Sequence, residues 1–478
     1  MQFNTFPYLI FLAVAIVLYW CLPQRFRRLF VLAVSLVFYA TWGIVFVAVP
    51  LVVSAFVFQI GRRLAAASPS NAKHWLWLGI SGVLALLIFF KYRDFLLLNV
   101  NVLITWIAAR PLTFAKLIAL PVGISFYTFE AIGYLIDVRQ GRVKAAGFMD
   151  VCLFFMFWPN VMSGPVVRAR ELVPQLKFCV KFEPRFIFEG IDRLVWGLVQ
   201  KNVVANVLGI WVDKGFHPAV IARPSTIDGW FVAVAFGLQI YFDFAGYSNM
   251  AIGAARLLGV TLPENFRQPY HAATPVDFWA RWHMTLSRWI RDYLFFPINA
   301  KWKGASVPLY VSLLAVMTLV GLWHGAGWNC ILWGFMHGVY LVLYRAYEAA
   351  KQARPALGAS PVISGAWRLL TLMSVTAAWV PFRSPNMHKT GAILSSMFVH
   401  FASGATYGTT FYVFTGGVAL FCAVEPFLVK RLGDIEECAG ANGTSLFRVL
   451  GRPLAYTCGF LLFMLFDEHN AQFIYSQF

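Results

Sequence analysis

Long, uninterrupted runs of apolar residues recur along the whole chain. The runs are continuous and do not alternate with polar residues, which excludes the strands of a membrane β-barrel. About 20 apolar residues in a helix are enough to cross roughly 30 Å of hydrocarbon. The pattern predicts spans at residues 3–22, 29–49, 50–60, 75–90, 95–108, 117–136, 151–162, 191–211, 230–258, 307–322, 328–344, 369–380, 411–429 and 453–466. Because several of these are too short to cross alone, we expect an all-α, polytopic membrane protein with about 10–12 transmembrane helices plus re-entrant and interfacial helices.

Two segments depart from this pattern. Residues 157–168 are apolar but contain two prolines and a glycine, which predicts a re-entrant segment that is buried in protein or lines a cavity. Residues 262–303 form the most polar interior stretch and cannot span. Large apolar side chains recur there at helical spacing among arginines, which is typical of a helix lying at the membrane interface; they are Trp279, Trp282, Leu286 and Trp289.

Composition agrees with the membrane assignment. Of the 478 residues, 60% are hydrophobic and 13% are charged, against about 25% charged residues in soluble proteins. The net charge of +18 could indicate nucleic-acid binding in a soluble protein. In a membrane protein the positive-inside rule explains it more simply, so we expect contact with membrane lipid and none with nucleic acid. The first run lacks the basic start and cleavage site of a signal peptide, and we expect it to be retained.

Charge and cysteine positions add three further expectations. Basic residues follow the first and third runs, at Arg25, Arg27 and Arg28 and at Arg62 and Arg63. They indicate the cytosolic side, which places the N-terminus outside the cytosol. The seven cysteines are scattered without a Cys-x-x-Cys pair, so we expect buried thiols and neither a metal site nor a disulfide framework. No linker or repeat divides the chain, which predicts a single transmembrane domain over residues 1–478.

Three of the nine histidines lie in apolar, Trp-rich sequence, where a polar side chain is costly and often functional. They are His283, His324 and His337. A single histidine in an apolar helix is more often a hydrogen-bonded structural residue. His324 is the best candidate because Trp323 and two glycines surround it, and burial would keep its imidazole neutral and able to act as a general base. His337 follows 13 residues later, so we expect it on a neighbouring helix, supporting the wall of the site.

Other patterns contribute less. Gln239 and Asp243 share one helix face, where Asp243 could line a substrate path or satisfy a helix end. The chain has no Gly-x-Ser-x-Gly elbow, no His-Glu-x-x-His motif and no glycine-rich nucleotide loop. We therefore expect neither a serine hydrolase nor a metalloprotease, and no tightly bound cofactor.

Eight motifs together resemble the membrane-bound O-acyltransferase (MBOAT) family, and within it the bacterial alginate O-acetyltransferase branch. They are LPVGISFYTF at 120–129, SGPVVR at 163–168, YFDFAGYS at 241–248, LPENF at 262–266, DFWARWHMTLS at 277–287, RDY at 291–293, GLWHG at 321–325 and FIY at 473–475. The resemblance places His324 at the essential histidine of the family and His283 in its second polar signature. Ala245 and Asn249 depart modestly from the family pattern.

The resemblance also implies a fold and a reaction. In the fold, funnels from both membrane faces meet at His324. In the reaction, an acetyl group passes from cytosolic acetyl-CoA across the inner membrane of a bacterium to an exported polysaccharide, by way of a periplasmic or membrane-anchored SGNH-type acetyltransferase. His324 would act as general base on an acceptor hydroxyl, or would carry the acetyl group itself. Besides the catalytic candidates His324 and His283, the candidates for substrate binding are Trp323, Arg281, Arg288, Arg291, Asp243 and His337.

Several alternatives stay open. The arginines suit the phosphates of CoA, but topology alone could explain them. A relative that acetylates peptidoglycan or cellulose, or one that transfers D-alanine, would keep the fold and change the donor or acceptor; length and the C-terminal spans favour the acetyl branches. A transporter of an acyl or glycan intermediate would make no covalent bond. Such transporters often show inverted repeats with paired broken helices, and the sequence has no such symmetry.

Overall fold

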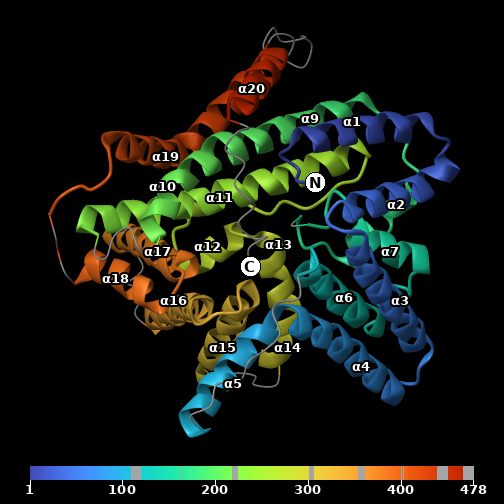
Figure 1. Ribbon diagram of the computed structural model, residues 1–478, viewed down its shortest axis with the longest axis horizontal. Coiled ribbons are helices and arrows are strands. Elements are labelled where there is room, and N and C mark those ends of the chain that lie inside the picture. Colours follow the sequence, from blue (N-terminus) through green and yellow to red (C-terminus); the bar gives the residue numbers. More distant parts are fainter. Residues whose placement is uncertain are drawn as a thin grey trace. The chain divides into compact units, whose positions relative to one another are not determined.

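The computed structural model describes residues 1–108, 120–162, 164–217, 224–300, 306–353, 361–399, 401, 403–438 and 451–466. Within these ranges every regular element is a helix (Figure 1). The prediction of an all-α protein is thereby confirmed. The FIY motif at 473–475 and Ser163 lie outside the described residues.

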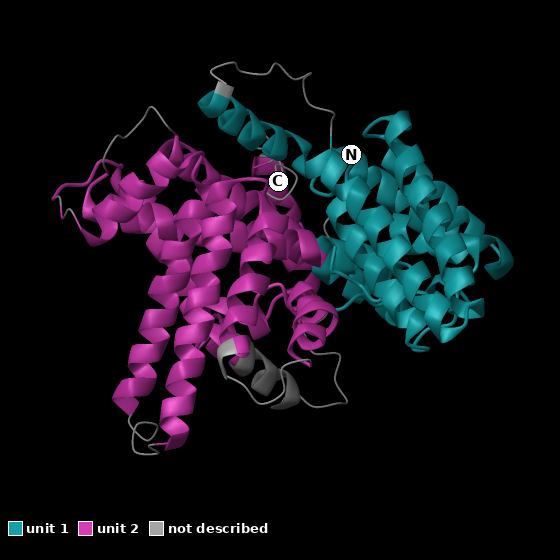
Figure 2. Cartoon of the chain, turned by 90° about the horizontal axis from the view of Figure 1, so that it is seen from below, with its two compact units in different colours: residues 1–194, 250–263 teal, residues 195–249, 264–478 magenta. Residues whose placement is uncertain are grey.

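The chain forms two compact units (Figure 2). Unit 1 comprises residues 1–194 and 250–263, and unit 2 comprises residues 195–249 and 264–478. Two helices, α9 (Pro184–Leu198) and α11 (Thr226–Leu257), run from one unit into the other. The single transmembrane domain stays a prediction.

Unit 1 is built mainly from the N-terminal helices. They are α1 (Phe6–Cys21), α2 (Gln24–Ala40), α3 (Ile44–Ala66), α4 (Pro69–Leu87), η1 (Ile88–Tyr92), α5 (Arg93–Ala108), α6 (Ile124–Arg139), α7 (Phe148–Met156), α8 (Ala169–Leu172) and η2 (Gln175–Lys177). The end of α11 completes the unit. There the Tyr19 hydroxyl donates to the Leu258 carbonyl at 3.1 Å, and the Trp20 indole N–H donates to the Leu257 carbonyl at 2.9 Å.

Two helix boundaries in unit 1 differ from the prediction. The predicted division between spans at residues 49 and 50 is wrong, because Pro50 lies inside α3 and the chain instead breaks at Gly43. Gly43 has a φ of +134°, which glycine adopts without steric cost, whereas a proline near a helix start costs a single hydrogen bond. The predicted gap between residues 90 and 95 is also wrong, since the π-helical turn η1 joins α4 to α5.

The re-entrant segment agrees better with its prediction. After α7 ends at Met156, the chain continues through turns to residue 162 and without regular secondary structure over residues 164–168, almost entirely buried. Asn160 donates from Nδ2 to Oε1 of Glu130 at 3.1 Å, which fixes this segment to α6. A Cβ on Gly164 would lie 2.1 Å from the Asn160 side chain, so the tight turn requires glycine there.

Unit 2 contains the remaining helices. They are η3 (Val199–Ala205), α10 (Asn206–Phe216), most of α11, η4 (Pro269–His271), α12 (Pro275–Arg281), α13 (Met284–Ile290), η5 (Arg291–Phe295), α14 (Phe296–Asn299), α15 (Ser306–His324), α16 (Trp328–Ala353), α17 (Pro361–Arg383), α18 (Met387–Phe398), α19 (Thr409–Cys438) and α20 (Arg452–Phe466). The helices α15 and α16 form the most closely packed pair, and α17 lies against α16.

The polar stretch at 262–303 is not the single interfacial helix that its spacing predicts. The backbone of His283 takes a left-handed conformation, with a φ of +41°, and separates α12 from α13. Three of the four apolar side chains in the expected lipid-facing stripe, Trp282, Leu286 and Trp289, are buried in protein, and Trp282 is only 1% exposed. Trp279 is half-buried. Helical periodicity alone could not distinguish a stripe that faces lipid from one that faces the protein core.

Within the described residues, six helices are long and apolar enough to cross a membrane, and three shorter apolar helices accompany them. The six are residues Ile44–Ala66, Pro69–Ile107, Pro184–Phe216, Thr226–Leu257, Pro361–Arg383 and Thr409–Leu428. The protein is therefore a multi-pass membrane protein. Three of the described cysteines, Cys21, Cys179 and Cys458, are exposed, which corrects the expectation that all thiols are buried. The side chain of Cys438 lies outside the described part.

Candidate active site

The site begins with a close crossing of α15 and α16. A Cβ added to Gly334 would lie 2.2 Å from the carbonyl oxygen of Met317, and one added to Gly321 would lie 2.2 Å from that of Cys330. Both contacts are far inside van der Waals distance, so only glycine allows the two backbones to approach so closely. The last residue of α15, three positions beyond Gly321, is His324.

Aromatic side chains enclose His324, which is 3% exposed. Its ring centroid lies 4.7 Å from that of Trp323, 5.0 Å from that of Trp333 on α16 and 5.5 Å from that of Phe382 on α17. Three consecutive helices of unit 2 therefore position one imidazole. Apolar rings thus replace water around this imidazole.

His337 lies on the same wall. It follows Trp333 by one helical turn on α16, and the two ring centroids are 4.9 Å apart. The ring of His337 also stacks on Phe278 at 6.0 Å and meets Trp279 at 5.1 Å, both from α12. Trp333 thus contacts both histidines. His337 lies on a neighbouring helix as expected, and its part in the site stays a prediction.

Buried ring nitrogen atoms that form no hydrogen bond with the described residues gather in this wall. The indole Nε1 atoms of Trp279, Trp333 and Trp379 and the Nε2 atom of His337 are buried and have no partner among the described residues. The ring centroids of Trp333 and Trp379 are 6.0 Å apart. Buried polar groups are normally hydrogen-bonded, and N–H donors beside a base are suited to stabilising negative charge on a carbonyl oxygen. We call Trp333 and the rings that surround it, those of Trp279, His337, Trp379 and Phe382, the aromatic wall.

His283 occupies a separate hydrogen-bonded node and is fully buried. Its Nδ1 lies 2.9 Å from Oδ1 of Asn265, which also accepts the Thr285 hydroxyl at 2.8 Å. The amide nitrogen of Asn265 donates to the Ser248 hydroxyl at 3.1 Å. These bonds hold the left-handed backbone of His283 and join the LPENF and DFWARWH motifs.

The node also fixes the proton on His283. Because Oδ1 of Asn265 only accepts, Nδ1 of His283 must carry the hydrogen, which leaves Nε2 with the lone pair. Burial lowers the pKa of His283 to about 3, so the ring is neutral at physiological pH. The ring centroid of His283 lies 4.7 Å from that of Phe244. These contacts are those of a structural histidine, and a catalytic role for it stays a prediction.

The structure does not gather the three candidate arginines around one ligand. Arg281 pairs with Asp277 at 2.7 Å along α12, and Arg291 pairs with its neighbour Asp292 at 2.7 Å. Arg288 is exposed. Two of the three cations are thus partly neutralised by acids of their own helices, and their part in binding CoA stays a prediction.

Asp243 lies in the middle of α11, 1% exposed, and forms an ion pair with Lys201 of η3. This position excludes the helix-end alternative. Next to the pair, Asn249 donates from Nδ2 to Oε1 of Gln200 at 2.7 Å. Buried charges at membrane depth are costly and persist where they are paired. These polar side chains therefore either stabilise the π-helical turn η3 or line a path for the substrate.

Sequence reasoning missed several of these residues. Trp333, Trp379 and Phe382 complete the wall, and only the spacing of Trp333 one turn before His337 could have signalled any of them. Lys201 had a clearer signal, because it is a charge inside a predicted span. Among the described residues, no cluster of three or more metal-binding side chains is found.

Comparison with known proteins agrees with this geometry. The model of the membrane-bound O-acyltransferase family matches residues 88–380, which include α15, α16 and most of α17. The chain is 37% identical to a probable alginate O-acetylase AlgI of Azotobacter vinelandii, over 83% of this chain and 77% of that protein.

More distant relatives act on other polymers. A peptidoglycan O-acetyltransferase of Helicobacter pylori is 34% identical over 78% of this chain and 74% of its own length. A teichoic acid D-alanyltransferase of Streptococcus thermophilus is 29% identical over 51% of this chain and 62% of its own length. All of these names describe the transfer of an acyl group, either acetyl or D-alanyl. The chain is an acyltransferase and belongs to the membrane-bound O-acyltransferase family.

Proposed function

We propose that this protein transfers acetyl groups from cytosolic acetyl-CoA across the bacterial inner membrane for the O-acetylation of an exported polysaccharide, alginate. The observation that carries the proposal is His324, buried against Trp333 beside the close crossing of α15 and α16. The extent of identity to alginate O-acetylases supports the choice of polymer.

In the proposed reaction, His324 takes the proton of an acceptor hydroxyl while the hydroxyl oxygen attacks the thioester carbonyl. The C–S bond then breaks, and the proton on His324 passes to the leaving CoA thiolate. Negative charge develops on the carbonyl oxygen during attack. The indole N–H of Trp333, which is buried beside His324 and has no partner among described residues, is the donor we assign to that oxygen.

A covalent route is the rival mechanism. His324 would then attack the thioester itself, and an acetyl-histidine would hand the group to the acceptor. In either route we expect the acceptor to be presented by a periplasmic or membrane-anchored SGNH-type acetyltransferase, which completes transfer to the polymer. No tightly bound cofactor is part of the proposal.

The test is acetyl transfer by vesicles containing the purified protein, with labelled acetyl-CoA on the cytosolic side. We expect CoA release that depends on His324, so that His324→Ala abolishes it while His388→Ala, at an exposed histidine of α18, retains it. Equal release by all three proteins would overturn the proposal. No release with any acceptor would favour the transporter.

The same vesicles distinguish the remaining alternatives. Label that stays on His324 after acid quenching, and that an acceptor removes, would establish the covalent route. Alginate oligosaccharides and peptidoglycan fragments, supplied in turn with the partner acetyltransferase, decide between the two polymers; the match to the peptidoglycan enzyme makes the second comparison necessary.

A further inference from the structure

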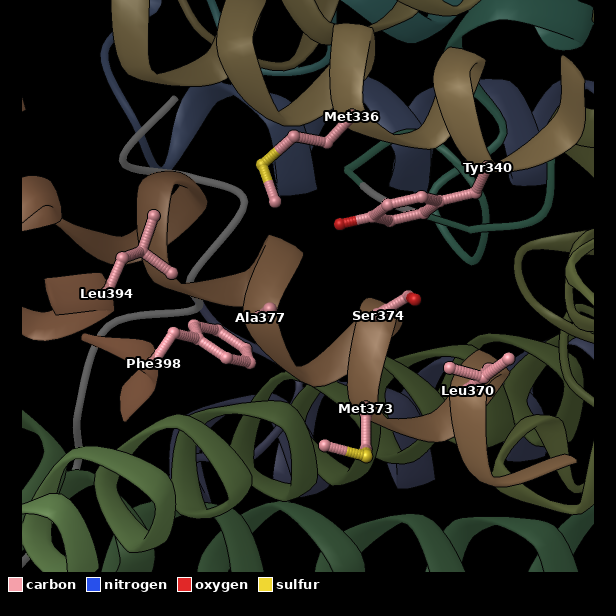
Figure 3. A pocket seen from close by; sticks show the side chains of 8 residues that line it. All are labelled: Met336, Tyr340, Leu370, Met373, Ser374, Ala377, Leu394 and Phe398. Carbon is pink, nitrogen blue, oxygen red and sulfur yellow. The ribbon is translucent and has the colours of Figure 1, made fainter. Parts of the chain in front are cut away.

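A cavity of about 370 Å³ lies between α16, α17 and α18, and the proposed reaction does not use it. Met336 and Tyr340 line it from α16, Ser374 and Ala377 from α17, and Phe398 from α18 (Figure 3). The whole cavity belongs to unit 2.

The lining determines which ligands can fit. No charged side chain lines the cavity, and apolar groups, including the thioethers of Met336 and Met373, make up most of its wall. This composition excludes the phosphates of CoA and the carboxylates of an acidic saccharide, because each would lose its hydration without compensation. Two hydroxyls, those of Tyr340 and Ser374, are the polar exceptions, and neither has a hydrogen-bond partner among the described residues.

The cavity opens at the outer surface of α17 and α18. Leu370 and Phe398, which line it, are 52% and 46% exposed. They belong to a larger apolar surface, since Leu369 and Leu372 on the same helix are also exposed. Because α17 is one of the helices that can cross the membrane, exposed leucines along it contact lipid tails. The cavity therefore opens toward hydrocarbon.

We propose that this cavity binds one hydrocarbon chain of a membrane lipid, with the hydroxyls of Tyr340 and Ser374 donating to an ester carbonyl of that chain. The volume lies near the lower end of the range for ligand pockets, roughly 300–1,000 Å³, so a single chain fits and a whole lipid does not. A hydrocarbon chain that moves from the bilayer into the cavity gains no hydrophobic free energy, because both environments are apolar. The binding free energy comes instead from dispersion contacts between the chain and the lining side chains, which the empty cavity lacks, and from the two hydrogen bonds.

The bound chain also contacts the helices that carry the aromatic wall. The ring of Tyr340 lies 5.7 Å from that of His337, and Ala377 precedes Trp379 by two residues. A chain in the cavity thus packs against both α16 and α17. This lipid site does not depend on the proposed reaction, and it can be tested without acetyl-CoA.

The experiment is photocrosslinking in vesicles of phosphatidylethanolamine and phosphatidylglycerol, with a diazirine in one acyl chain of the latter. We expect adducts on peptides containing Met336 and Met373, mapped by mass spectrometry. Ser374→Phe fills the cavity and should lower this labelling about tenfold, equivalent to roughly 1.4 kcal/mol of binding. Tyr340→Phe keeps the shape but removes one hydroxyl, so about a fivefold loss is expected.

Leu372→Phe is the matched control, because it adds the same ring to the exposed face of the same helix and should leave the labelling unchanged. Labelling of a peptide containing Val52, an exposed residue of α3, provides the internal reference. If Ser374→Phe fails to accumulate, Ala377→Leu fills the cavity from the same helix. Equal labelling of wild type and the filling variant, relative to Val52, would overturn the proposal and point to another occupant, such as a protein helix.

Discussion

Alanine at Gly334 should separate α15 from α16 and thereby move His324. The added Cβ would lie 2.2 Å from the Met317 carbonyl oxygen, whereas ordinary contact begins at 3.4 Å. The obstacle is backbone and cannot rotate away, so the helices must part by the difference, about 1.2 Å. A displacement of about 1 Å can cost a catalytic step about 100-fold. We therefore expect kcat to fall by about two orders of magnitude, with a smaller change in KM.

A graded series tests this reasoning. At Gly338, further along the same pair of helices, an added Cβ would lie 3.1 Å from the Cα of Leu314, so a shift of only about 0.3 Å is needed. Gly338→Ala should therefore lose less than about tenfold in kcat. Gly416→Ala on α19 is the control, since nothing lies within 4 Å of its added Cβ.

The assay is the initial rate of CoA release from labelled acetyl-CoA, with size-exclusion chromatography and circular dichroism to establish that each variant is folded. Full activity of a folded Gly334→Ala protein would refute the idea that the close crossing positions His324. An equal loss in Gly338→Ala would refute the proposed dependence on distance.

Three further predictions concern individual side chains. Trp333→Phe keeps the ring but removes its N–H, so kcat should fall about 100-fold while Trp328→Phe, at an exposed position of α16, has no effect. Lys201→Met removes the cation that pairs with the buried Asp243 carboxylate and should cost about 3–5 kcal/mol, whereas the double variant with Asp243→Leu should recover most of it; thermal unfolding in detergent measures both, and equal losses would contradict the pairing. Because burial lowers the pKa of His283 to about 3, the unfolded chain binds a proton that the folded chain excludes as the pH falls below about 6.5. The wild type should thus lose about 2 kcal/mol more stability between pH 6.5 and pH 5 than His283→Asn, which tolerates the left-handed backbone; parallel pH profiles would contradict this.

The sequence predicted the helices and the central histidine well, for a physical reason. Apolar length determines which segments can cross a bilayer, and an isolated polar residue in such sequence is conspicuous because its burial is costly. His324 is buried as expected, at the end of α15. The separation of His337 onto α16 also followed, because the intervening glycines made one continuous helix improbable.

Long-range contacts could not be predicted in this way. Nothing in the local sequence around Trp379 or Phe382 indicates that they meet His324 or Trp333, since a tryptophan in an apolar helix usually serves as core. The break at His283 was missed for a related reason. Periodicity describes which residues share a face but not whether the backbone continues, and here Asn265 holds a conformation that local preference disfavours.

The division of unit 1 into residues 1–194 and 250–263 sets an order for its biosynthesis. The carbonyls of Leu257 and Leu258, which accept hydrogen bonds from the indole of Trp20 and the hydroxyl of Tyr19, are synthesised long after α1. At about 5–20 residues per second, the ribosome needs roughly 3–11 s to make the intervening residues 195–249. During this interval unit 1 is incomplete, because the Tyr19 hydroxyl and the Trp20 indole lack the carbonyls that later accept their hydrogen bonds. The beginning of unit 2 is synthesised in the same interval.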